Sequence, residues 1–124
     1  ISFTSIKAFD PLVIEGKKVF SDTSFFKCLN NSELIIGENS VLTIKNRNKL
    51  IFESGSKLHI LKDGKILIND GALNFLSNSS LKLDKNAVIE LGKKGKMTFG
   101  EKVKSEKARG AKLPKGVFIT NDYY

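Results

Sequence analysis

The chain contains very little cysteine and histidine, with one residue of each, Cys28 and His59, among 124. A lone cysteine cannot form an internal disulfide, and one cysteine with one histidine cannot complete a structural zinc site. Long apolar runs are missing too, because the longest extend over a few residues whereas a membrane-spanning helix needs about 20. We therefore expect no metal, no cofactor and no membrane span, and we expect Cys28 to lie in the core.

The sequence motifs of several common active sites are also missing. The chain has no nucleotide-binding fingerprint and no hydrolase elbow, and the segment Gly92–Lys96 is too short for a phosphate-binding loop. No signal peptide is recognisable, and the chain begins with Ile1 rather than methionine, so we expect it to be a segment of a longer protein.

Positive charge, in contrast, is in excess, and most of the excess lies in one stretch. The net charge is +8, and residues 93–115 hold nine basic residues against Glu101 and Glu106, which leaves a net charge of +1 for the rest. One interpretation is a binding site for an anionic polymer. The other, which we favour, is a solvated cap, because lysine commonly blocks pairing at the end of a sheet. The candidate binding residues are Lys93, Lys94, Lys96, Lys102, Lys104, Lys107, Arg109, Lys112 and Lys115.

An acidic polysaccharide or a host or cell surface is the expected partner if this basic stretch binds a polymer. Nucleic acid is less favoured, because no aromatic residue for base stacking lies between Lys102 and Lys115. The charge pattern leaves the oligomeric state open, and it is compatible with end-to-end or side-by-side association.

The most frequent pattern in the chain is a short phrase of one apolar residue, any residue and another apolar residue. Ten such phrases begin every eight residues, with one step of seven between Ile66 and Leu73, and all twenty outer positions are apolar or cysteine. This alternation is typical of a β-strand that buries two side chains and exposes the one between them. Gly, Asn and Asp lie between the phrases, as tight corners require. The phrases are 26–28, 34–36, 42–44, 50–52, 58–60, 66–68, 73–75, 81–83, 89–91 and 97–99.

A longer period distinguishes between the two folds that such phrases allow, an antiparallel meander and a solenoid. The third residue of every third phrase belongs to one distinct series, Cys28, Phe52, Phe75 and Phe99, whereas the other two series hold only Ile and Leu. A meander gives no reason for a period of three phrases. A three-sided solenoid does, because equivalent residues then stack one coil apart, at about 4.8 Å. We therefore predict an all-β, three-sided solenoid with about 24 residues per coil.

This pattern resembles the right-handed parallel β-helix of pectate-lyase-like proteins over residues 26–99. The plain coils with Gly and Asn corners are most similar to adhesin passengers and filamentous-haemagglutinin-type surface proteins. The resemblance implies a right-handed parallel β-helix in a secreted or surface-exposed protein. Residues 1–25 then form an irregular N-terminal coil or cap, and residues 100–124 form a basic C-terminal cap or lead into further coils.

The outward positions of the predicted coils offer no catalytic arrangement. No face carries two acidic residues in adjacent coils, as a carboxylate pair requires, and His59 beside Lys82 has no nucleophile and no orienting acid. We therefore predict a non-enzymatic structural or adhesive segment, a rigid stalk or an adhesin passenger. The alternatives are a carbohydrate-binding or polysaccharide-degrading β-helix with its active site outside this segment, a phage or viral tail-spike β-helix, and a polyanion-binding module.

Overall fold

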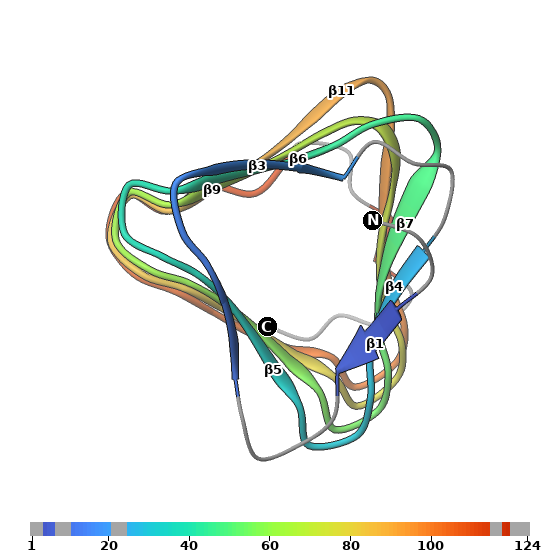
Figure 1. Ribbon diagram of the computed structural model, residues 1–124. Helices are drawn as coiled ribbons and strands as arrows, with labels where there is room; N and C mark the ends of the chain where they lie inside the picture. Colours follow the sequence, from blue (N-terminus) through green and yellow to red (C-terminus); the bar gives the residue numbers. More distant parts are fainter. Residues whose placement is uncertain (1–3, 7–10, 21–24, 115–117, 120–124) are drawn as a thin grey trace.

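The chain folds into a solenoid of parallel strands (Figure 1). The computed structural model describes residues 4–6, 11–20, 25–114 and 118–119, and within these ranges the regular secondary structure is entirely β-strand. The strands are β1 (Thr4–Ile6), β2 (Leu12–Ile14), β3 (Lys17–Phe20), β4 (Phe25–Cys28), β5 (Glu33–Ile36), β6 (Val41–Ile44), β7 (Asn48–Phe52), β8 (Lys57–Ile60), β9 (Lys65–Phe75), β10 (Ser80–Leu83), β11 (Val88–Phe99), β12 (Lys104–Lys107) and β13 (Phe118–Ile119). No helix long and apolar enough to cross a membrane occurs in the described part of the chain.

The strands form three parallel ladders, in which each strand pairs with its equivalent one coil earlier and one coil later. The first ladder contains β3, β6 and the N-terminal halves of β9 and β11. The second contains β2, β5, β8, β10 and β12. The third contains β1, β4, β7, the C-terminal halves of β9 and β11, and β13.

The coil length agrees with the prediction, since Leu34 pairs with Leu58 and Leu58 pairs with Leu81, at separations of 24 and 23 residues. Viewed along the axis from the N-terminal coil, the chain runs clockwise as it recedes, which is a right-handed coil (Figure 1). The predicted all-β solenoid with about 24 residues per coil is therefore confirmed.

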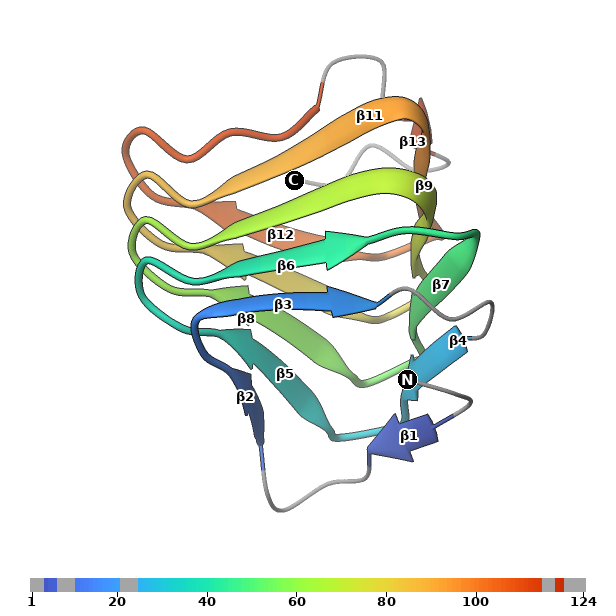
Figure 2. The same ribbon diagram turned by 45° about the horizontal axis from the view of Figure 1, so that its top comes forward.

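Two long strands join the first and third ladders into one sheet. β9 and β11 continue around the corner between these ladders without a turn, as Figure 2 shows. The predicted step of seven residues between Ile66 and Leu73 lies inside β9, so the corner is shortened rather than interrupted. β11 contains one residue more at this corner, and its register with β9 shifts between Leu91 and Lys94, as at a β-bulge.

The core lies inside the coils and consists of columns of equivalent side chains. Nineteen of the twenty predicted inward residues are buried, and the exception, Leu91, is partly buried beside the register shift. The predicted aromatic column is present: the ring centroids of Phe52 and Phe75 are 4.9 Å apart, and those of Phe75 and Phe99 are 5.2 Å apart. Cys28 pairs with Phe52 and is fully buried, and this burial raises the pKa of the Cys28 thiol to about 12.

The corner between the second and first ladders is a column of equivalent turns. In each turn one residue adopts a positive φ, which Gly, Asn and Asp tolerate best. Backbone N–H groups of one turn donate to carbonyl groups of the next, for example Asn39 to Lys62 at 3.2 Å and Asp63 to Lys85 at 3.0 Å. The positive-φ residues are Gly16, Asn39, Asp63, Asn86 and Gly110.

The corner between the third and second ladders contains a second column of turns, closed by buried serines. The hydroxyl groups of Ser32, Ser56 and Ser79 donate to carbonyl oxygens three residues earlier, at 2.6 to 2.7 Å. These hydrogen bonds satisfy polar groups that lie next to the core, where an unpaired hydroxyl would be costly.

The ladders extend beyond residues 26–99 in both directions. β2 and β3 pair with β5 and β6, and β12 pairs with β10. The predicted caps at 1–25 and 100–124 include residues outside the described ranges and remain predictions.

Candidate functional site

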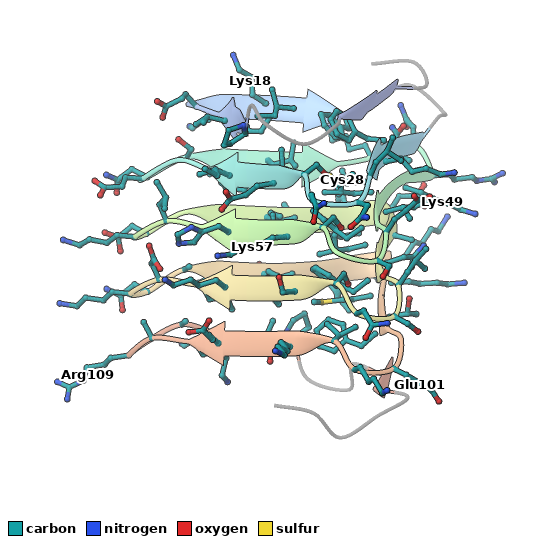
Figure 3. All side chains as sticks on the ribbon, turned by 90° about the horizontal axis from the view of Figure 1, so that it is seen from below. Lys18, Cys28, Lys49, Lys57, Glu101 and Arg109 are labelled. Atoms are coloured by element: carbon teal, nitrogen blue, oxygen red, sulfur yellow. The ribbon has the colours of Figure 1, made fainter. Side chains whose placement is uncertain are left out.

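The nine basic residues of the predicted anionic-polymer site do not gather in one place. Residues 93–115 make up about one coil, so their side chains are distributed around the solenoid. The eight that the structure describes are exposed, and Lys115 lies outside the described residues. Figure 3 illustrates this separation, since Glu101, the neighbour of Lys102, and Arg109 lie at opposite edges of the stacked coils.

The positions of these residues follow the course of the last coil. Lys93, Lys94 and Lys96 lie at the bend of β11, and Lys102 lies in the turn that follows. Lys104 and Lys107 belong to β12. Arg109 lies at the next corner, and Lys112 returns to the first ladder through a bridge with Val88.

Two of the predicted residues, Lys94 and Lys96, instead share a hollow with residues from the two preceding coils. The hollow has a volume of about 420 Å³ and lies on the outside of the corner between the first and third ladders; we call it the basic corner cleft. Four of its lining side chains are cationic and one is a carboxylate. The lining residues are Arg47, Lys49, Asp70, Gly71, Ala72, Lys94 and Lys96.

The register of the third ladder explains how the cleft forms. Ala72 of β9 pairs with Lys49 of β7 on one side and with Lys96 of β11 on the other. Because the side chain of Ala72 is a single methyl group, the space between the two lysines stays open. The backbone N–H of Arg47 donates to the carbonyl of Asp70 at 2.8 Å, which ties the rim to the bend of β9.

Arg47 and Lys49 are absent from the sequence prediction because both lie between the repeated phrases. The signal was nevertheless present, since residues 49, 72 and 96 are separated by 23 and 24 residues, one coil each. Extending the coil period to the residues between the phrases would have placed Lys49 and Lys96 in one column.

His59 lies in a second polar cluster, on the outer face of the second ladder. Its Nε2 is 3.0 Å from Oδ1 of Asp84, and its Nδ1 is 3.7 Å from Oε2 of Glu33. The three residues come from three successive coils, so the ring bridges the coil before it and the coil after it.

The expectation that His59 has no orienting acid was therefore wrong. Asp84 directly follows β10, and its side chain reaches diagonally to the ring in the previous coil, a contact that pairing of opposite residues does not reveal. Both ring nitrogens face carboxylates, which leaves neither of them directed at a nucleophile. The arrangement is suited to joining coils.

Metal ligands do not cluster in the described ranges: no group of three or more His, Cys, Asp or Glu side chains there is placed to hold an ion. Comparisons of the chain with protein-family models, curated proteins and solved structures find no match. The resemblance to pectate-lyase-like and adhesin β-helices thus rests on the repeat pattern alone, and what the structure shows is a parallel β-solenoid.

Proposed function

We propose that this chain is a non-enzymatic structural segment of a secreted or surface-exposed protein, in which the solenoid serves as a rigid stalk or as an adhesin passenger. The observation that carries the proposal is the continuous core. Columns of fully buried side chains pass from coil to coil, and ladders on all sides hold each coil to the next.

A core of this kind favours stiffness for a physical reason. Burial of apolar surface contributes roughly 25 cal/mol per Å², and here it is shared by adjacent coils, so tilting one coil away from the next would expose both. The stacked turns add backbone hydrogen bonds between coils at two corners. A segment that resists bending along its axis can hold other parts of a protein at a fixed distance.

The repeated outer surface supports an adhesive role. Outward residues recur one coil apart in columns such as Lys27, Ile51, Asn74 and Thr98. Because these positions repeat along one axis at about 4.8 Å, an extended partner could contact several coils at once, which increases avidity without any single strong site.

Labelling of intact cells tests the proposed location. An antibody raised against the purified chain should bind unpermeabilised cells of the source organism or detect the protein in the culture medium. Labelling that requires permeabilisation would contradict a surface or secreted location.

Competition tests the adhesive role separately. The folded purified chain, added in excess, should reduce attachment of the same cells to their natural substratum. A chain unfolded by Ile68→Asp serves as the matched control, because it retains the composition and loses the surface. Equal inhibition by both proteins, or no inhibition by either, would contradict the adhesive role. The role as a rigid stalk would be unaffected.

A further inference from the structure

We propose that the basic corner cleft binds a linear polysaccharide that carries carboxylate or sulfate groups, with the polysaccharide running parallel to the solenoid axis. This site goes beyond the structural role, because it is built by residues of three successive coils that lie far apart in the sequence. It also differs from the basic stretch 93–115, since only Lys94 and Lys96 belong to both.

The charge of the cleft is unbalanced. Within the part of the chain that the structure describes, none of the four cationic side chains, Arg47, Lys49, Lys94 and Lys96, forms an ion pair. Other lysines of the same solenoid are paired, as Lys65 is with Glu90 at 2.8 Å. Four cations and one carboxylate, that of Asp70, give the cleft a net charge of +3. Such a concave, cationic surface attracts anions and forms charge-assisted hydrogen bonds with them.

The register of β7, β9 and β11 gives the bound polysaccharide its direction. Lys49 and Lys96 lie in one column with Ala72 between them, so two strand spacings, about 9.6 Å, separate their backbones along the axis. An extended polymer along this column would meet a cation before and after the small residue. The low floor at Gly71 and Ala72 lets the polymer approach the backbone.

The neighbouring column is suited to sugar hydroxyl groups. Asn74 and Thr98 follow Ala72 and Lys96 by two residues on the same outer face, and Thr98 Oγ1 donates to Asn74 Oδ1 at 2.9 Å. Their remaining hydrogen-bonding capacity faces solvent beside the lysines. None of the residues that line the cleft is aromatic, so the base stacking by which single-stranded nucleic acids are bound is missing there.

Charge reversal at the two ends of the column tests the site. The variant Lys49→Glu with Lys96→Glu is compared with Lys62→Glu with Lys85→Glu, which changes the net charge equally on exposed residues of another corner. Binding of a heparin dodecasaccharide, a hyaluronan dodecasaccharide and a single-stranded DNA 12-mer is measured by titration calorimetry at 0.15 M salt. We expect the cleft variant to bind at least one of the two polysaccharides at least about tenfold more weakly, and the control pair to stay within about threefold of the unaltered chain.

A third variant tests the axial path without removing a cation. Ala72→Glu places a carboxylate between Lys49 and Lys96 and should also weaken polysaccharide binding by at least about tenfold. All variants should melt within a few degrees of the unaltered chain, because the altered positions lie on the outer surface.

Four results would overturn the proposal. They are equal losses in the cleft and control pairs, undiminished binding by Ala72→Glu, no binding of either polysaccharide by the unaltered chain, and tighter binding of the DNA than of both polysaccharides. None of these results bears on the location or stiffness of the segment, which the cell-labelling experiment addresses independently.

Discussion

At the scale of single residues, the position of a residue in a column of equivalent inward side chains determines which side chain fits there. Cys28 lies under Phe52, at the point where the aromatic column begins among the described residues. A thiol is small enough for this place and tolerates an apolar environment. The cost is chemical, because the charged thiolate is strongly disfavoured there, and the pKa rises to about 12 from an ordinary value of 9.0.

The reactivity of Cys28 follows from this environment. We expect the thiol to resist iodoacetamide at pH 8 in the folded chain and to react readily in denaturant, because both the accessible surface and the thiolate are missing in the fold. Mass spectrometry of the alkylated chain gives the measurement. Rapid modification under native conditions would show that the core opens at this column.

The same pKa predicts a pH dependence of stability. Above about pH 9 the unfolded chain loses the thiol proton while the folded chain keeps it up to about pH 12. The folded state then binds more protons, so the free energy of unfolding falls as pH rises, and the contribution is complete only below pH 9. From pH 8 to pH 10 this amounts to about 1.4 kcal/mol. Denaturant titrations of the unaltered chain and of Cys28→Ala should differ by this amount in their pH dependence, and parallel curves would contradict it.

At the scale of elements, the bend of β9 and β11 depends on a glycine in each strand, Gly71 and Gly95. Asn48, Gly71 and Gly95 are paired in one column at this corner. A Cβ atom at Gly95 would collide with the backbone carbonyl oxygen of Ile68, and one at Gly71 would collide with that of Asn48. The strand can therefore continue through the corner only because these positions are glycine.

We expect Gly95→Ala to destabilise the chain by about 2–3 kcal/mol, since the atom it contacts belongs to the backbone and cannot rotate away. Lys93→Ala, an exposed residue of the same bend, is the control and should change stability by less than about 0.5 kcal/mol. Thermal unfolding followed by circular dichroism distinguishes the two. A neutral Gly95→Ala would mean that the bend is wider than described.

The His59 cluster acts between elements, because it connects three strands of the second ladder. A double-mutant cycle with His59→Ala and Asp84→Ala should give a coupling energy of about 0.5–1 kcal/mol, as for a partly exposed hydrogen bond to a carboxylate. The control cycle pairs His59→Ala with Asp63→Ala, an acidic residue in the turn that follows β8. Its coupling should be close to zero, and equal coupling in both cycles would rule out the specific contact.

At the scale of the whole molecule, stability depends on an uninterrupted core rather than on any one coil. Ile68→Asp places a carboxyl group among fully buried aliphatic side chains and should cost at least about 3–5 kcal/mol, a large part of the stability of a small domain. The adjacent Leu67 points outward, and Leu67→Asp should cost less than about 1 kcal/mol. Leu58→Asp should behave as Ile68→Asp does. Equal unfolding midpoints for Ile68→Asp and Leu67→Asp would contradict the alternation.

The sequence predicts most of this architecture because side-chain periodicity and solenoid geometry repeat together. The spacing of Phe52, Phe75 and Phe99 was sufficient to place the inward columns. Contacts that cross columns were not predictable in the same way. The reach of Asp84 to His59 is diagonal, and the basic corner cleft depends on how the backbone of β9 follows a corner. Hydrogen bonding of the backbone decides that course, and the pattern of apolar residues does not encode it.

The unequal construction of the three corners has a consequence for how such a molecule could acquire new parts. Where β9 and β11 pass from the first ladder to the third, the sheet is continuous, and an inserted segment would break the hydrogen bonds between these two strands. The two columns of turns lie outside the strand ladders and are joined between coils by isolated backbone hydrogen bonds, so a loop added there would leave the sheets intact. Long loops are therefore expected at the two corners that consist of turns. The corner formed by β9 and β11 instead carries the basic corner cleft.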